Sequence, residues 1–236
     1  MQITYNQVKK ILDTLPIGYY LGHSIPPVKL SKESDSTYIN QITEEITVSF
    51  QNVQTMLQNA PDDIDVESVV RGLLYHEVSH AVLTPAIQFF PEAIGFDGNN
   101  LCYAFCQIKH EYKKRFGREL SFSDCKDFFN IVEDERIETL LKDYYLNVDF
   151  RKNVVLLNGI TDPEKELENS DLFKRLFLVC RYHVGTQEEL RLLKNVISNS
   201  KKLTNKSDAS DLKNYFGNIF IKHFVSSKNT AYLCVH

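Results

Sequence analysis

The stretch LLYHEVSHAVLTP, residues 73–85, places three ionisable side chains among leucines, valines and an alanine. It forms the second half of a helix that the sequence predicts over 65–84, with an aspartate as N-terminal cap and a proline directly after it. Two of the ionisable residues, His76 and His80, are four positions apart, so they project from the same face of this helix. Buried imidazoles are costly without partners, so the pair needs either hydrogen bonds or a cation.

Two imidazole nitrogens on one helical face can bind a single divalent cation, and zinc accepts such nitrogens at about 2.0–2.1 Å. Glu77 lies about 100° around the helix from His76, so it is no third ligand but can reach a water molecule on the metal. In the pattern His-Glu-x-x-His, two histidines bind zinc and the glutamate acts as general base. The alternative is a pair of core histidines satisfied by hydrogen bonds, with Glu77 on a solvated edge. The apolar surroundings favour the metal site.

A catalytic zinc site takes a third protein ligand, which the sequence predicts on a helix over 123–146. On a helical wheel Glu133 lies in the middle of an apolar stripe, where a carboxylate is unfavourable unless a cation faces it. We therefore expect Glu133 to be the third ligand, with Asp134 in reserve, and Glu135 to point to water. The groups expected to hold the ligating imidazoles by their second nitrogen are Asn130, Asp134 and Glu138, with Arg136 paired to one of them. The alternative is a structural network of ion pairs between helices.

The other predicted elements run in blocks. A helix over 4–14 precedes short β-like segments between residues 17 and 51, among which EITVSF, 45–50, alternates apolar and polar residues like a half-buried strand. Further helices are predicted over 101–116, 171–184, 187–199 and 208–224, with a polar break over 158–171. Strands followed by helices predict an α+β fold, with an N-terminal helix, a small mixed sheet, the histidine helix and a mainly helical C-terminal half. We expect a core domain over 1–150 and a helical subdomain over 151–236 packed on it.

Composition narrows the class of protein. The 236 residues are 43% hydrophobic and 25% charged, with a net charge of −4 and no long basic run, which argues against a dedicated nucleic-acid binder. No apolar run reaches the roughly 18 residues of a membrane span, and the N-terminus lacks the pattern of a secretory signal. The five cysteines show no zinc-finger spacing, so we expect buried, reduced thiols and a cytoplasmic protein.

Two motifs carry a resemblance to a known family. HEVSH, followed some fifty residues later by NIVEDERIE, resembles the gluzincin branch of the zincin metallopeptidases, and is similar to compact peptidase-like domains of bacterial and phage proteins. The resemblance covers residues 66–146. It implies a zincin-like fold, one Zn²⁺ per chain bound by His76, His80 and Glu133, and Glu77 as the catalytic base. The motif NExxSD of larger gluzincins is not recognisable in this chain.

The resemblance implies a zinc metallopeptidase that hydrolyses peptide bonds through a metal-activated water, with Glu77 moving the proton. A second donor would stabilise the tetrahedral intermediate, and Tyr182 and His183 are the candidates for it. A peptide substrate would add as a strand to the edge of the sheet, for which EITVSF is the expected edge. The alternative function is a catalytically silent zincin-fold binding or structural module, in a phage or another large assembly.

The partners expected on either reading are proteins or peptides, with no nucleic acid and no membrane. For a phage-encoded protein, the expected cytoplasmic location would be the host's. The sequence predicts no oligomeric state.

Overall fold

The protein is α+β and mainly helical, with one small three-stranded sheet. The computed structural model describes residues 3–15, 19–20, 23–40, 43–60, 64–84, 109–110, 113–114, 117, 119, 121–142 and 158–203. They fall into two compact units, Met1–Thr84 with Ile137–Thr161, and Pro85–Arg136 with Asp162–His236. The division into 1–150 and 151–236 stays a prediction, because its boundary lies outside the described residues.

The sheet of the first unit has the strand order β3-β5-β4. Strand β5 (Glu45–Ser49) pairs in parallel with β3 (Val28–Ser31) and antiparallel with β4 (Tyr38–Asn40). Two very short strands, β1 (Tyr19–Tyr20) and β2 (His23–Ser24), form a separate antiparallel pair. The sheet is therefore mixed, as the sequence predicts.

The expectation that EITVSF forms the sheet edge is wrong, because β5 is the central strand. Its polar residues are buried along with its apolar ones: Thr47 is 2% exposed and Ser49 is fully buried. The Ser49 hydroxyl donates to the carbonyl of Ser34 (2.6 Å) and accepts from the backbone N–H of Asn52 (3.2 Å). The alternation therefore reflects buried polar side chains and not a solvated face. Within the described residues, β3 and β4 are the edges of this sheet.

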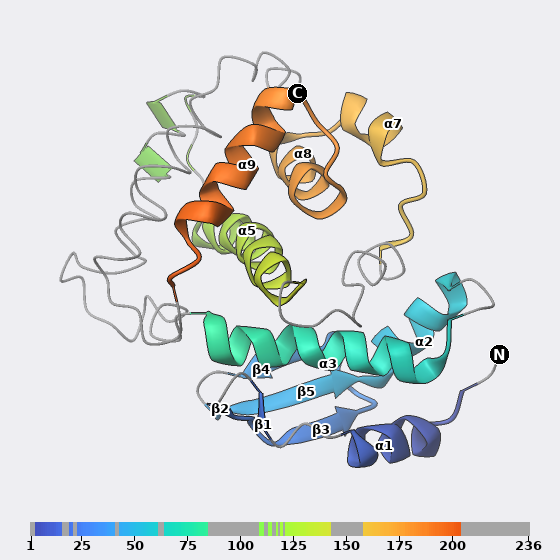
Figure 1. Ribbon diagram of the computed structural model, residues 1–236. Helices are drawn as coiled ribbons and strands as arrows, with labels where there is room; N and C mark the ends of the chain where they lie inside the picture. The colour runs from blue at the N-terminus through green and yellow to red at the C-terminus, as the bar shows by residue number, and fades with distance from the viewer. Residues whose placement is uncertain are drawn as a thin grey trace. The chain divides into compact units, whose positions relative to one another are not determined.

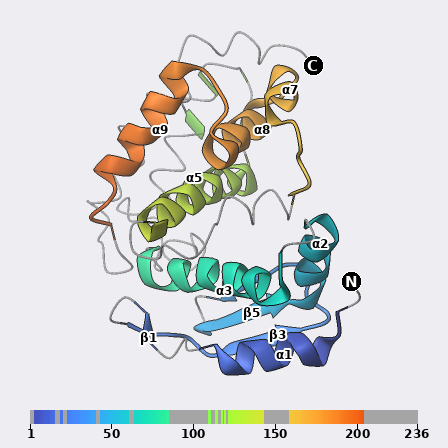
Figure 2. The ribbon, with the colours of Figure 1, turned by 45° about the vertical axis from the view of Figure 1, so that its right-hand side comes forward.

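Helices α1 (Tyr5–Thr14) and α3 (Val66–Leu83) share the core of the first unit with the sheet. Helix α1 begins at a capping box formed by Thr4 and Gln7, and helix α3 begins at the predicted cap, Asp65. Figures 1 and 2 both show α3 running along the strands, and it contacts β4, β5 and α1. The buried side chains that join these elements include Val8, Leu12, Ile46, Val48, Val70, Leu74 and Val78.

Helix α2 (Phe50–Asn59) was not predicted. It follows β5 without a connecting loop, because Ser49 is both the last residue of the strand and the N-terminal cap of the helix. Val53 and Met56 bury the apolar side of α2. No Gly or Pro turn signal separates β5 from α2 in the sequence, so the start of this helix was not recognised.

The second unit is helical in its described part. It contains α7 (Pro163–Glu168), α8 (Leu172–Phe177), the π-helix η2 (Leu178–Tyr182) and α9 (Gln187–Asn199). The last three match the predicted helices over 171–184 and 187–199, whereas α7 is a six-residue helix inside the predicted polar break. The predicted helix over 208–224, and nearly all of that over 101–116, lie outside the described residues. No helix in the described ranges is long and apolar enough to span a bilayer.

One helix belongs to both units. Helix α5 (Phe122–Lys142) runs without interruption, and it counts with the second unit up to Arg136 and with the first from Ile137 onward. Its last turns carry buried Leu140 and Leu141, and Leu141 is part of the same core as α1, β5 and α3. The end of α5 therefore packs within the unit that contains the histidine helix.

Candidate metal centre

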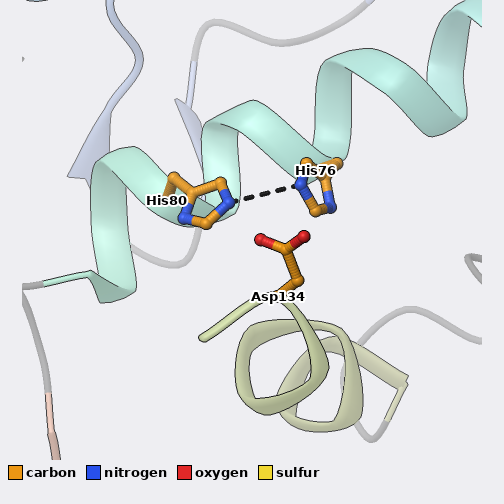
Figure 3. A group of neighbouring side chains, drawn as sticks. All are labelled: His76, His80 and Asp134. Atoms are coloured by element: carbon orange, nitrogen blue, oxygen red, sulfur yellow. Dashed lines mark hydrogen bonds between the residues drawn. The ribbon is translucent and has the colours of Figure 1, made fainter. Parts of the chain in front are cut away.

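The two histidines of α3 turn the same ring nitrogen toward each other. The Nε2 atoms of His76 and His80 are 3.2 Å apart, and the two rings are nearly perpendicular, with an interplanar angle of 82° (Figure 3). At a Zn–N distance of about 2.05 Å, nitrogens with the 3.2 Å separation subtend an angle of about 103° at the metal, close to the tetrahedral value of about 109°. The predicted i,i+4 pair therefore has the spacing that one tetrahedral zinc ion requires.

The other ring nitrogen of each histidine has a partner of its own. His76 Nδ1 lies 2.9 Å from Glu138 Oε1, and His80 Nδ1 lies 3.0 Å from the hydroxyl of Thr84. Glu138 is 7% exposed and Thr84 is fully buried. Contacts of this kind fix the orientation of a ligating imidazole and leave Nε2 for the metal. Glu138 was predicted in this role, whereas Thr84 was missed although it lies one helical turn after His80.

A carboxylate completes the group. Asp134 precedes Glu138 by four residues on the continuous helix α5, so both side chains project from the same helical face. Because Glu138 contacts His76, the same face brings Asp134 to the imidazoles, as Figure 3 shows. His76, His80 and Asp134 each offer one ligand atom, and these atoms all lie within 4.8 Å of one another.

The donor set fits a metal by its chemistry. Two neutral imidazoles and one carboxylate are the ligands of known catalytic zinc sites, in which the fourth position stays open. The side chains are partly buried, and two of the three are aligned by contacts with neighbouring side chains. Such contacts orient ligating imidazoles and support metal affinity. The same donor set can also bind Fe²⁺, so the ligands by themselves do not select zinc.

Glu77 is held by the sheet. Its Oε2 accepts a 2.8 Å hydrogen bond from the backbone N–H of Ile39 in edge strand β4, and the residue is 7% exposed. In the register of β4 with β5, Ile39 is the middle of three paired positions. Glu77 therefore does not lie on a solvated edge, which was the alternative expectation for it. One carboxylate oxygen of Glu77 is anchored to β4, and Glu77 directly follows His76, a candidate ligand, in the sequence.

The structure joins Glu133, the expected third ligand, to an arginine. Arg136 donates from Nε to Glu133 Oε2 (2.8 Å) and from Nη2 to Oε1 (2.5 Å). Both side chains are buried, at 1% and 0% exposure. The cation that stabilises this carboxylate in the apolar stripe is thus a guanidinium, and the reserve candidate Asp134 is the one grouped with the histidines. The ligand role of Glu133 stays a prediction that this geometry does not favour.

Glu135 does not point to water, and that expectation is wrong. It is 2% exposed, and its Oε1 lies 2.6 Å from Nε2 of His183. His183 follows the π-helix η2 in the left-handed conformation, with φ at 55°, and Tyr182 packs its ring against Phe177. The roles of His183 and Tyr182 as oxyanion donors stay predictions. Asn130 is partly buried on α5, and its proposed contact with an imidazole also stays a prediction.

No protein family, no curated protein and no solved structure matches this chain. The resemblance of the two motifs to the gluzincins therefore stays an expectation from sequence.

Proposed function

We propose that this chain is a zinc-dependent metallopeptidase with a zincin-like arrangement, in which His76, His80 and Asp134 bind one Zn²⁺ per chain. The observation that carries the proposal is the convergence of two pre-oriented Nε2 atoms and a carboxylate, with a glutamate next to the first ligand. The sequence pattern His-Glu-x-x-His assigns this glutamate the role of general base. The proposed substrates are proteins or peptides.

In this proposal, Glu77 transfers protons, and Glu138 and Thr84 orient the histidine rings. Zinc, when bound, lowers the pKa of a water molecule and polarises a carbonyl. The Glu77 carboxylate accepts the proton of the attacking water and later delivers it to the leaving amine. The bond from Ile39 N–H to Oε2 holds this carboxylate against β4 while it moves the proton. Glu138 and Thr84 hold the imidazole rings in the ligating orientation.

One observation favours a second candidate, a zincin-like binding or structural module without turnover. The buried contact of Glu77 with the Ile39 amide serves the fold whether or not any reaction occurs. In that case no base is needed, and Glu77 acts as an anchor for the short edge strand β4. A test must therefore separate the carboxylate's role as anchor from its role as base.

The variant Glu77→Gln makes this separation. The amide oxygen of glutamine still accepts the Ile39 N–H, so β4 stays anchored, but the group no longer takes a proton. We expect this variant to keep its melting temperature and one zinc per chain while hydrolysis of a diverse peptide library falls by about 10²–10⁴-fold. Glu77→Ala serves as the control that loses both the anchor and the base, so its melting temperature also falls.

Metal analysis identifies the ligands. We expect one zinc per wild-type chain, and its loss in His80→Ala and Asp134→Asn. Full activity of Glu77→Gln would overturn the general base. Zinc binding by a wild-type chain that cleaves no peptide would favour the silent module, and a wild-type chain that binds no zinc would overturn both the site and the peptidase.

A further inference from the structure

At Ile39, strand β4 directs its backbone polar groups away from the rest of the sheet. In an antiparallel pair of strands, opposite residues alternate between those that exchange two hydrogen bonds and those that exchange none. Ile39 lies opposite Ile46, whose N–H donates to the carbonyl of Pro27 (2.9 Å), just before β3. The pair of Ile39 and Ile46 is therefore of the second kind, and the N–H and the carbonyl of Ile39 both lie along the outer edge of β4.

Side chains occupy the hydrogen-bond donors of this edge. Glu77 Oε2 accepts from the N–H of Ile39 (2.8 Å), and Asn52 Oδ1 accepts from the N–H of Thr37 (2.7 Å), just before the strand. No side chain among the described residues donates to the carbonyl of Ile39. Covering the unpaired groups of an edge strand in this way opposes regular pairing with another strand. At Ile39 the edge therefore offers an acceptor but not a donor.

This edge restricts how a peptide can add to β4. In the regular antiparallel pattern, a peptide residue opposite Ile39 would donate its N–H to the Ile39 carbonyl and accept the Ile39 N–H with its own carbonyl. Glu77 already holds that N–H, so only the first of these two bonds can form while the contact lasts. The carbonyl of the peptide residue then has no donor from β4, and it faces the carboxylate that is the proposed base.

We propose that a substrate peptide lies antiparallel to β4 and binds it at Ile39 through the carbonyl alone, and that the peptide residue whose N–H makes this bond supplies the scissile carbonyl. Glu77 is then a positioning residue as well as a base, because by holding the Ile39 N–H it keeps the sheet from binding the carbonyl that must react. The inference rests on the proposed peptidase function. It adds the register of the substrate, in which the residue before the cleaved bond lies opposite Ile39.

The first test removes single N–H groups from a peptide that the wild-type chain cleaves. One backbone nitrogen is methylated at a time, and the nitrogen of the cleaved bond is left intact. We expect kcat/KM to fall by about 2–12-fold, the range for one hydrogen bond, when the residue before the cleaved bond is methylated. Methylation of the preceding residue, whose N–H faces away from β4, controls for the bulk of the methyl group. An equal effect at both nitrogens, or none at either, would overturn the register.

The second test needs no turnover. Glu77→Gln keeps an acceptor for the Ile39 N–H but lacks the base, so the same peptide binds without being cleaved. In NMR spectra of this variant, we expect the ¹³C signal of the Ile39 carbonyl to shift when the peptide binds, while the ¹H signal of the Ile39 amide stays in place. A shift of both signals would mean that the peptide takes the N–H, and would overturn binding through the carbonyl alone.

Glu77→Ala is the matched control, because it releases the Ile39 amide. Its amide signal should differ from that of Glu77→Gln before any peptide is added, which shows that the signal reports this contact. If Glu77→Ala does not fold, the spectra of Glu77→Gln with and without peptide still decide the question.

The failures of the two proposals are distinguishable. A wild-type chain that cleaves no peptide would overturn the proposed function and this inference with it. Cleavage that does not depend on the methylated position would overturn this inference alone. Shifts of the Ile39 signals with protein concentration and without peptide would mean that a second copy of the chain occupies the edge, and would overturn the peptide as its occupant.

Discussion

Replacement of Glu133 by leucine should cost this protein more stability than most single substitutions. Glu133 and Arg136 form a bidentate pair in which both side chains are buried, at 1% and 0% exposure. Arg136 also donates from Nη1 to the carbonyls of Ser200 (3.4 Å) and Leu203 (3.1 Å), so it ties α5 to the end of α9 within one unit. Without Glu133 the guanidinium loses the carboxylate that balances its charge, and the carbonyls of Ser200 and Leu203 are neutral acceptors.

The magnitude follows from the burial of the pair. Removal of one partner of a buried ion pair leaves an uncompensated charge and costs about 3–5 kcal/mol, against a total stability of about 5–15 kcal/mol for a typical domain. We expect this loss in Glu133→Leu, and a similar loss in Arg136→Met. The double variant removes both charges and leaves two buried carbonyls without the arginine, so it should lose only about 1–3 kcal/mol. The two substitutions should therefore be non-additive by about 3 kcal/mol or more.

Urea unfolding followed by circular dichroism gives the four free energies of this cycle. Additive losses in the double variant would refute the reasoning, because they would mean that the two side chains do not compensate each other. The milder Glu133→Gln, which keeps an acceptor for Arg136, should retain one zinc per chain. Loss of zinc in that variant without loss of stability would restore Glu133 as the third ligand in place of Asp134.

Two further predictions follow from the pKa shifts. Hydrogen bonds from the Ser68 side chain and then from its backbone N–H (2.7 Å) lower the pKa of Asp65, the N-terminal cap of α3. Asp65→Ala should therefore lower the free energy of unfolding by about 1 kcal/mol at neutral pH. In urea unfolding, this difference from the wild type should shrink as the pH falls below about 4, where the cap becomes protonated. Burial, and then the nearby Glu135 carboxylate, raise the pKa of the Cys180 thiol well above 9.0. Peptide mapping should therefore find Cys180 unmodified by iodoacetamide at pH 8 unless the protein is unfolded. The contribution of the protonated thiol to stability should be present below about pH 8.5 and should decline as the pH rises further. Modification of folded Cys180, or an Asp65→Ala difference that grows in acid, would contradict these assignments.

Local sequence signals predicted the elements whose determinants are local. The cap at Asp65 and the apolar periodicity marked α3, and the helices over 171–184 and 187–199 followed from the same kind of evidence. The spacing of His76 and His80 by itself placed both rings on one face, because four residues complete about one helical turn. Helix α2 was not predicted, because its N-terminal cap, Ser49, is also the last residue of strand β5.

Other features depended on which chain segments meet. The wheel of α5 correctly put Glu133 in an apolar stripe, but a wheel does not say whether an arginine or a metal supplies the compensating charge. The burial of Glu135 likewise depends on His183, 48 residues away in the chain. The central position of β5 depends on pairing with a parallel strand and an antiparallel one.

The sequence by itself thus determined the α+β class, the histidine helix and the placement of His76 and His80 on one helical face, since each depends on neighbours within a few residues. Only the tertiary structure decided that Asp134 and not Glu133 joins the histidines, that Glu138 and Thr84 orient them, and that Glu77 is anchored to β4. The physical reason is that a carboxylate's role is set by the charge and hydrogen-bond donors facing it, and these come from segments that are distant in the chain.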